Sequence, residues 1–427
     1  MPAKLWLNAG KLLCGSGLSA VMLLLTAAVS ARTLGTQDFG ILVFVQALAL
    51  VVGQIFSFNA WQAVVTFGSQ AVQQNDENRL GKIVKMAFCL DLAGGFVAWL
   101  ALFAAGNMLV RMAGWPAATA SMLLVYSPAV IFSGTGATIG SLRLFRHFGI
   151  LAAALAIAPL FRLLGTFVAM FYGCGLYGFV IVNLAATLAG QLALFGMTIS
   201  SIGRQRVFAF FSQSVRGFWQ EFSQFRSFVW TTNLHSTIKM LSREADQLLT
   251  AVVIGPAGIA LLKVARQFAR ILPIFGDPLY QTLFSELSEL LAQGRRREFA
   301  QLVHRSAVTA MLSGLAGLVF FWLFGQPVIV MAFGESFAGA WLTAMIFMVA
   351  MTFGLGGIPL QPAMLALGQP EASFRINLLA TAVYLAALLP LAGKFGIEGA
   401  ASAYVLYFVI WDTLMYIRLR KEMGGND

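Results

Sequence analysis

The chain has 427 residues, of which 59% are hydrophobic and only 11% charged, and its formal net charge is +11. Soluble proteins carry about 25% charged residues, so this composition excludes an ordinary soluble enzyme or binding domain. One helical span takes about 20 apolar residues, so about twelve spans fit in the chain and leave room for little else. The predicted fold class is an all-α integral membrane protein.

Apolar runs of span length follow one another along the whole chain. The first run follows Lys4 and Lys11, as the apolar part of a secretory signal peptide would. It reaches span length, however, and a second run begins directly after it, so we expect a retained first helix. The twelve predicted spans are residues 12–32, 39–62, 84–106, 117–139, 150–171, 177–199, 229–254, 257–279, 305–325, 339–364, 375–392 and 399–417.

The connections between these spans alternate between a basic set and a short, nearly uncharged set. Lysines and arginines in or beside the connections number 19 on the basic side and 3 on the other. The positive-inside rule therefore predicts that both termini are cytoplasmic and that the number of spans is even. Because this asymmetry accounts for the basic net charge, no nucleic-acid partner is expected. The basic connections are 1–11, 63–83, 140–149, 200–228, 280–304, 365–374 and 418–427.

Two of the basic connections are long enough to hold structure of their own. Segment 200–228 interleaves arginines with aromatic residues, which is typical of an amphipathic helix lying on anionic lipid. Segment 284–304 is predicted to extend the preceding span as a helix that ends at Gly294.

Glycine turns recur at a nearly constant distance along the chain. Gly255 follows Gly35 by 220 positions, and Gly396 follows Gly175 by 221 positions. The two halves therefore form a repeat of six spans each, in the same membrane orientation. Such a repeat predicts two six-helix bundles related by a pseudo-twofold axis along the membrane normal.

The repeat also predicts the domain organisation. We expect an N-terminal six-helix lobe over residues 1–200, a cytoplasmic amphipathic connector over 201–228 and a C-terminal six-helix lobe over 229–427. Two such lobes with a substrate site between them are the plan of many transporters.

Six basic residues remain inside the predicted spans. A central Arg or Lys costs about 2.5–3.5 kcal/mol on insertion scales, so these side chains are expected to line a wet cavity, pair with acids or extend to the interface. The six are Arg162, Lys239, Arg243, Lys263, Arg266 and Arg270.

The spacing of five of them favours a cavity. Lys263, Arg266 and Arg270 follow the i, i+3, i+7 pattern of one helix face, and Lys239 and Arg243 follow i, i+4 on the span before. Because a tight turn at 255–256 makes these spans antiparallel, Arg243 and Arg266 are both expected about 17 Å from the turn, near the bilayer midplane.

The repeat provides a control for this basic stripe. In the first half, the positions that match Arg243, Arg266 and Arg270 are held by Leu23, Gln46 and Leu50. The common scaffold therefore does not require the charges, and we expect them to bind an anionic substrate group such as phosphate or pyrophosphate, which arginine holds by paired charge-assisted hydrogen bonds. Pairing with acids such as Glu244 or Asp277 is the alternative for part of the stripe.

Three acids inside the spans are candidates for coupling to Na+ or H+: Asp246, Asp91 and Asp412. For Asp91 and Asp412 a hydrogen bond between packed helices is an equal alternative. The sequence contains no nucleophile–base constellation, metal motif or nucleotide-binding loop, so no catalytic residues, bound metal or other cofactor are expected.

One motif indicates a family. Residues Ala31 to Gly40, with the sequence ARTLGTQDFG, resemble the "ARxLGxxxFG" turn between the first two helices of bacterial polysaccharide flippases. These are the O-antigen and capsule exporters of the MATE-like (MOP) superfamily. The turn Gly175–Gly178 and the stretch Asp246 to Arg270 are also similar to that family.

This resemblance implies a function and a location. It implies a flippase that moves undecaprenyl-pyrophosphate-linked oligosaccharide, such as an O-antigen, capsule or exopolysaccharide repeat unit, across the bacterial inner membrane by alternating access. Arg266 would then occupy a position like that of cavity arginines in related flippases. Membrane proteins of polysaccharide assembly would be its protein partners.

Three alternatives remain at the level of the sequence. A drug or metabolite antiporter of the same fold would need an acidic cavity, whereas this chain has a basic excess. A lipid II flippase more often has helices beyond twelve. A polysaccharide polymerase or ligase typically needs a large outer loop, and the longest outer connection predicted here is 326–338.

Overall fold

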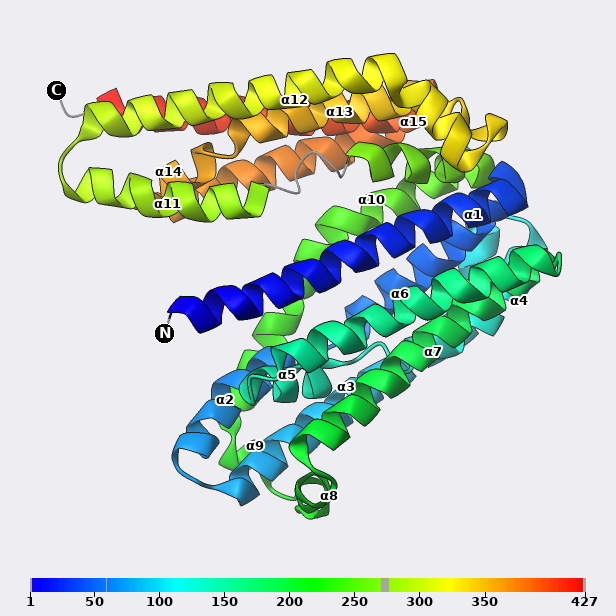
Figure 1. The fold of residues 1–427 in the computed structure, drawn as a ribbon, viewed down its shortest axis with the longest axis vertical. Coiled ribbons are helices and arrows are strands. Elements are labelled where there is room, and N and C mark those ends of the chain that lie inside the picture. Colours follow the sequence, from blue (N-terminus) through cyan, green and yellow to red (C-terminus); the bar gives the residue numbers. More distant parts are fainter. Residues whose placement is uncertain (1, 59, 270–275, 425–427) are drawn as a thin grey trace. The chain divides into compact units, whose positions relative to one another are not determined.

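The computed structural model describes the backbone of residues 2–58, 60–269 and 276–424 (Figure 1). The side chains of 2–16, 235, 236, 238–246, 276–278, 281 and 424 lie outside this description. The described residues are almost entirely helical, as the composition predicts. The helices are α1 (Pro2–Phe56), α2 (Trp61–Gln73), α3 (Glu77–Met112), α4 (Ala117–Tyr126), η1 (Ser127–Val130), α5 (Gly136–Leu144), α6 (Phe148–Phe171), α7 (Gly175–Ile202), α8 (Arg204–Ser212), α9 (Phe218–Glu221), α10 (Ser223–Ala269), α11 (Gly276–Ala292), α12 (Arg296–Phe333), η3 (Glu335–Phe337), α13 (Ala340–Gly357), α14 (Leu360–Ala366) and α15 (Pro370–Gly424).

In the described part of the chain, eight helical stretches are long and apolar enough to cross a membrane, and the shorter α4–η1 stretch is also apolar. The twelve predicted spans fall on helices apart from short breaks in the second, fourth and tenth spans, and residues 270–275 of the eighth span lie outside the description. Helix α15 contains two whole predicted spans, and α1 and α10 each contain one whole span and part of the next. The all-α membrane fold is therefore confirmed.

The double-length helices are divided by the glycines that the repeat identified. Gly35 in α1 has φ 70° and ψ −177°, and Gly255 in α10 has φ 69° and ψ −173°. Gly396 in α15 has φ 62°, and its repeat partner Gly175 has φ 59° at the start of α7. The conformation of Gly35 and Gly255 is accessible essentially only to glycine, so this pair makes the same turn at matching positions of the two halves, and Gly175 and Gly396 share a positive φ.

The chain forms two compact units, Met1–Leu248 and Leu249–Asp427. The first part of α10 belongs to the N-terminal unit because its residues pack there: Phe225 and Val229 lie in a core with α2 and α3, and Asn233 donates a hydrogen bond to the carbonyl oxygen of Ser57. The lobe boundaries at residues 200 and 229 remain predictions of the repeat.

Two predicted spans of the N-terminal unit are interrupted. The second span breaks between Phe56 and Trp61, where α1 ends and α2 begins, and the fourth breaks between Val130 and Gly136, where η1 ends and α5 begins. At both breaks the backbone packs directly against glycines of α3, where a side chain would not fit. A Cβ atom on Gly94 would collide with the Phe56 carbonyl oxygen, and one on Gly95 would collide with the Ile131 carbonyl oxygen.

The predicted connector, residues 201–228, is folded onto the N-terminal unit. Phe210, Phe222 and Phe225 are buried in a core with α2 and α3, whereas Phe208 is 78% exposed. The ammonium group of Lys85 on α3 donates to the carbonyl oxygens of Phe211 and Gln213, both at 2.7 Å. This differs from the expected amphipathic helix with its aromatic face in lipid, because α2 and α3 supply an apolar surface that those rings cover instead.

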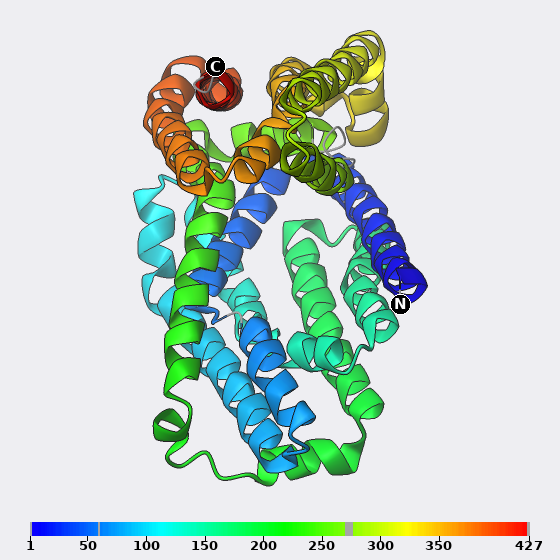
Figure 2. The same cartoon turned by 90° about the vertical axis from the view of Figure 1, so that its left-hand side faces the viewer.

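In the C-terminal unit, α13 packs against both α12 and α15, and α11 packs against α12 and α14. In Figures 1 and 2, α15 forms two helical arms, drawn in orange and red. Leu287, Phe299 and Met415 belong to a buried core that joins α11, α12 and α15.

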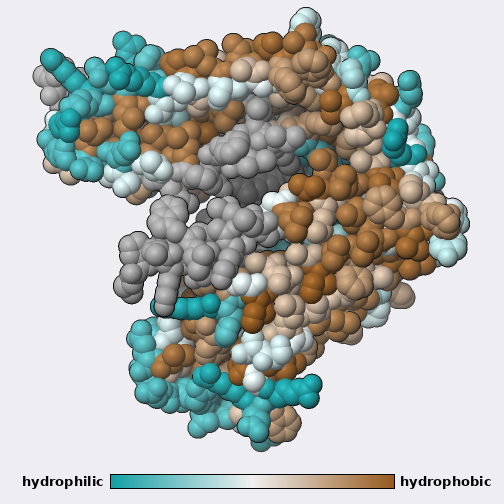
Figure 3. Space-filling model, in the orientation of Figure 1, coloured by the Kyte–Doolittle hydropathy of each residue, from teal (hydrophilic) through white to brown (hydrophobic). Residues whose placement is uncertain are grey.

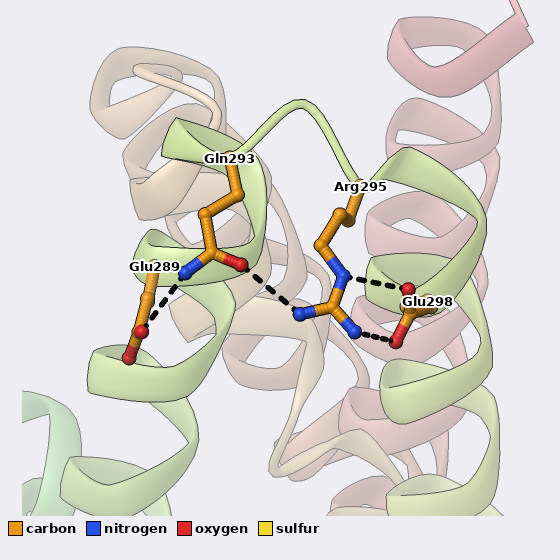
Figure 4. Close-up of polar contacts among 4 residues, drawn as sticks. All are labelled: Glu289, Gln293, Arg295 and Glu298. Carbon is orange, nitrogen blue, oxygen red and sulfur yellow. Dashed lines mark hydrogen bonds and ion pairs between the residues drawn. The ribbon is translucent and has the colours of Figure 1, made fainter.

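The turn between α11 and α12 confirms the predicted helix end at Gly294, whose φ is 71°. Just after it, the Arg295 guanidinium pairs with the Glu298 carboxylate and donates to the side-chain oxygen of Gln293 at 3.0 Å (Figure 4). Gln293 in turn donates to Glu289 at 3.0 Å. The hydrogen bond from Arg295 to the Glu298 carboxylate raises the pKa of Arg295 above its ordinary value. The guanidinium therefore stays charged at this water-exposed turn.

Apolar side chains cover much of the surface (Figure 3). On α6 and α12, for example, Phe171 is 83% exposed, Phe320 is 64% exposed and Trp322 is 59% exposed. Hydrophilic residues gather at helix ends, such as the α11–α12 turn and the region of α8 and α9 (Figure 3). Large apolar rings exposed along a helix are expected where lipid, rather than water, is the surrounding solvent.

Candidate functional site

Arg266 is the predicted substrate residue whose surroundings the structure shows best. It lies on α10 in the C-terminal unit and is only 9% exposed. Its guanidinium carbon lies 5.3 Å from the centre of the Phe347 ring on α13. A cation held over an aromatic face is attracted by the ring's quadrupole, and the attraction grows when water is excluded. The basic residue at this position is therefore a buried, specifically held cation and not one that extends to the interface.

Other members of the basic stripe are described only in part. Lys263, one turn before Arg266, is partly buried. The backbone of Lys239 and Arg243 is helical within α10, as predicted, but their side chains lie outside the description. Arg270 lies outside the described residues altogether. Whether the stripe converges on one ligand therefore stays a prediction.

Arg162 occupies a different environment, in the N-terminal unit. It lies on α6, and its guanidinium donates to the hydroxyl of Thr187 on α7 at 3.1 Å. The Thr187 hydroxyl in turn donates to the carbonyl oxygen of Asn183. The Nε atom of Arg162 is buried and has no hydrogen-bond partner within the described residues. These contacts make Arg162 a link between the paired helices α6 and α7.

Aromatic residues that were not predicted from the sequence gather next to Arg266. The Phe347 ring meets Tyr404 of α15 edge to face, with centroids 5.8 Å apart. Tyr404 lies 5.7 Å from Tyr384, which is on the other arm of α15. Tyr407 and Phe408 complete the group, at 6.0 Å and 5.2 Å from Tyr404. The i, i+3, i+4 spacing of Tyr404, Tyr407 and Phe408 along one helix face was the usable signal.

Asp91, an ion-coupling candidate, holds one of the helix breaks in place. It is 2% exposed on α3, and its Oδ2 atom accepts a hydrogen bond at 2.8 Å from the backbone amide of Ala137, in the first turn of α5. A Cβ atom on Gly134 would come within 2.7 Å of the Asp91 side chain. The contact matches the helix-packing alternative, and the carboxylate also faces the positive end of the α5 dipole.

One carboxylate oxygen of Asp91 is not used in this contact. Oδ1 is buried and has no hydrogen-bond partner among the described residues. A buried carboxylate oxygen without a partner is costly while it is charged, so this atom is a site where a proton or a cation would be stabilised. The structural contact and the coupling role are compatible.

Asp412, the second described acid, lies on α15 one helical turn beyond Phe408. A Cβ atom on Gly357, the last residue of α13, would collide with its Oδ1 atom and lie 2.6 Å from Trp411. That Oδ1 atom is buried and has no hydrogen-bond partner in the described part of the chain. The third acid, Asp246, has its side chain outside the description. Of the ion-coupling candidates whose side chains the structure describes, Asp412 is thus the one that lies in the same unit as Arg266 and its aromatic neighbours.

The fold is shared with solved membrane transporters. A multidrug resistance MATE family transporter of the MOP superfamily, in its inward-facing conformation, superposes with a TM-score of 0.75 at 13% identity, over 95% of each chain. The lipid II flippase MurJ, in an inward closed conformation, has a TM-score of 0.70 at 14% identity, over 96% of this chain and 88% of MurJ. At these identities the likeness establishes the fold and not the substrate.

Sequence relatives specify the family. Inner membrane protein YghQ of Escherichia coli (strain K12) is 24% identical over 330 residues, which cover 76% of this chain and 90% of the relative. The model of the family described as "Polysaccharide biosynthesis protein" matches residues 29–342. This match begins before the Gly35 turn and includes Arg266, so it takes in most of both halves. The chain is therefore a member of this family of polysaccharide biosynthesis proteins, built on the MATE-like all-α membrane fold.

Proposed function

We propose that this protein flips undecaprenyl-pyrophosphate-linked oligosaccharide from the cytoplasmic to the periplasmic leaflet of the bacterial inner membrane, with both of its termini in the cytoplasm. The family match and the transporter fold support a membrane protein that moves a polysaccharide precursor. The observation that carries the substrate class is Arg266, a buried cation in an apolar helical stretch that is long enough to cross a membrane.

The physical problem of flipping such a lipid is the charge of its pyrophosphate. A charged group at the centre of a bilayer is costly, at about 2.5–3.5 kcal/mol even on the mild insertion scales. Arg266 offers a guanidinium whose charge persists at all physiological pH values and whose planar fork suits phosphate oxygens. The Phe347 ring, 5.3 Å from the guanidinium carbon, helps to hold this group in place. A buried arginine of this kind lowers the barrier for an anionic headgroup more than for a neutral or cationic one.

The basic position is specific to one half of the repeat. Gln46 stands where the repeat places the equivalent of Arg266, so the same helical scaffold forms with a neutral side chain.

Alternating access between inward- and outward-open forms needs a driving force, and we propose that Na+ or H+ supplies it. Asp412 is the candidate described in the same unit as Arg266, with Asp91 as a second candidate in the N-terminal unit.

The test is transport by purified protein in proteoliposomes. Undecaprenyl diphosphate bearing one N-acetylglucosamine serves as substrate, and its appearance in the opposite leaflet is the readout. Arg266→Gln is the most informative variant because the repeat shows that glutamine fits the scaffold at this position. We expect it to lower the transport rate about 10- to 100-fold, since a hydrogen bond to a charged group contributes about 1.5–3 kcal/mol.

Two further variants complete this experiment. Arg266→Lys keeps the charge and loses the planar fork, so it should retain part of the activity. Arg375→Ala is the matched control, because Arg375 is also an arginine of the C-terminal unit but its side chain is 80% exposed in a surface pair with Glu371. Transport at the wild-type rate by folded Arg266→Gln protein would contradict the proposed role of Arg266.

A further inference from the structure

The aromatic residues beside Arg266 form a continuous group, here named the tyrosine cluster: Phe347, Tyr384, Tyr404, Tyr407 and Phe408. We propose that the tyrosine cluster binds the sugar nearest the pyrophosphate and is thus the glycan-recognising half of the substrate site. This inference rests on the proposed function and adds to it the residues that would distinguish a glycosylated carrier lipid from the bare one.

The contacts of the cluster join the cation to the tyrosines without a gap. Arg266 lies 5.3 Å from the Phe347 ring, Phe347 lies 5.8 Å from Tyr404, and Tyr404 and Tyr407 stack at 6.0 Å with an angle of 13° between their planes. Each step is comparable with the width of one sugar ring. In a lipid-pyrophosphate glycan the first sugar is bonded directly to the phosphate, so a phosphate at Arg266 brings that sugar to the neighbouring rings.

Burial divides the cluster into a support and a contact surface. Phe347 is 1% exposed and Tyr384 is 2% exposed, so these two rings fix the positions of the others. Tyr404, Tyr407 and Phe408 are only partly buried. Tyrosine presents a flat apolar ring and a hydroxyl that donates and accepts hydrogen bonds, and a sugar presents the matching apolar C–H face and hydroxyl groups.

The repeat shows that the fold itself does not need these rings. With Gly175 aligned on Gly396, the positions of Tyr384, Tyr404, Tyr407 and Phe408 are held in the first half by Leu163, Asn183, Ala186 and Thr187. These four first-half residues lie on α6 and α7, which pack together in the N-terminal unit without an aromatic group at these positions. The same unit also has Gln46 in place of Arg266. The first half thus lacks both the counterpart of Arg266 and the four α15 rings, although its Arg162 donates to Thr187 there, whereas the second half has both, as expected for two parts of one ligand site.

The test compares two lipids that differ only in the sugar. Binding of undecaprenyl diphosphate, and of undecaprenyl diphosphate bearing one N-acetylglucosamine, is measured on the purified full-length protein in detergent. The wild type should bind the sugar-bearing lipid about five- to tenfold more tightly, because one aromatic contact is worth up to about a tenfold change in affinity. Tyr404→Leu and Tyr407→Leu should bring that ratio to about one.

Three controls separate recognition from packing. Tyr404→Phe keeps the ring and should retain most of the ratio even if the leucine variant folds poorly. Tyr416→Leu removes a tyrosine of the same helix that is 53% exposed and outside the cluster, and it should leave the ratio unchanged. Arg266→Gln should weaken the binding of both lipids by the same factor and so preserve the ratio.

The failures of the two proposals are distinguishable. If the wild type binds both lipids equally, or if folded Tyr404→Leu protein keeps the wild-type ratio, the tyrosine cluster is a packing core and this inference is overturned, while the role of Arg266 stands. If the wild type binds neither lipid, the proposed function itself is overturned, and the inference with it.

Discussion

Gly35 and Gly255 occupy equivalent positions in the two halves of the chain and adopt the same backbone conformation, with φ of 70° and 69° and ψ of −177° and −173°. In this region of conformational space a side chain is strained, so a residue other than glycine costs of order 1–3 kcal/mol. Neither glycine has a neighbouring atom within 4 Å of where a Cβ would stand. The need for glycine is therefore a property of the turn and not of packing.

We expect Gly35→Ala and Gly255→Ala each to lower the free energy of unfolding by about 1–3 kcal/mol, and by similar amounts because the two turns are equivalent. Thermal unfolding of the purified protein in detergent, followed by tryptophan fluorescence, measures the effect. Gly196→Ala is the matched control, since Gly196 lies inside α7 with equally open surroundings. There alanine should stabilise by about 1 kcal/mol through helix propensity, and a destabilising Gly196→Ala would remove the distinction.

Asp91 is expected to be a structural acceptor whatever its role in coupling. Asp91→Ala leaves the buried amide of Ala137 without its acceptor and should destabilise the protein by about 1–3 kcal/mol. Asp91→Asn keeps a carbonyl oxygen that can accept from the same amide, so it should be much less destabilising. The unfolding temperatures of the two variants provide the comparison. Equal losses for Asn and Ala would show that the charge, and not the hydrogen bond, maintains the contact with α5.

The close approach of Asp412 to Gly357 predicts a coupled pair of substitutions. Gly357→Ala places a methyl group against the Asp412 carboxylate and Trp411, and overpacking of this kind costs about 1–3 kcal/mol. Adding Asp412→Ala removes one of the two obstructions, so the double variant should regain part of the lost stability. The coupling energy from the four unfolding curves tests this, and strictly additive effects would contradict the contact.

If Asp412 carries the coupling proton or cation, its charge must change or be balanced during transport. Asp412→Asn has nearly the same shape and no charge, so we expect it to fold and to bind the substrate, but to lose the stimulation of transport by an imposed Na+ or H+ gradient. Transport in proteoliposomes with and without each gradient is the measurement. Full gradient stimulation in Asp412→Asn would assign coupling to another acid.

Two lysines on α3 allow a matched test of how the connector is held. Lys85 donates to two backbone carbonyl oxygens and is partly buried, whereas Lys82 forms an ion pair with Glu221 whose partners are 27% and 46% exposed. Lys85→Ala should therefore increase tryptic cleavage in segment 204–216 severalfold, because hydrogen bonds to a charged group are worth about 1.5–3 kcal/mol. Lys82→Ala should have little effect, because an exposed pair contributes about 0–1 kcal/mol. Equal cleavage of the two variants would contradict this difference.

Much of the fold was predictable because it depends on local composition. Long apolar runs have to be helical in a membrane, since only a helix satisfies its own backbone hydrogen bonds there, and the glycine turns are positions where other residues are strained. The expected helix end at Gly294 has the same local origin. The connector was less predictable: Phe210 and Phe222 resemble lipid-facing residues until α2 and α3 provide a protein surface for them.

The sequence by itself determined the membrane-spanning helices, the repeat of the glycine turns and the presence of Arg266 at a position where the first half has Gln46. Only the tertiary structure decided what Arg266 and Asp91 touch. The ring under Arg266 comes from a helix far away in the sequence, and the amide held by Asp91 comes from the far side of an interrupted helix. Hydropathy and backbone strain are properties of each segment alone, whereas these contacts depend on how distant segments pack, which no local pattern specifies.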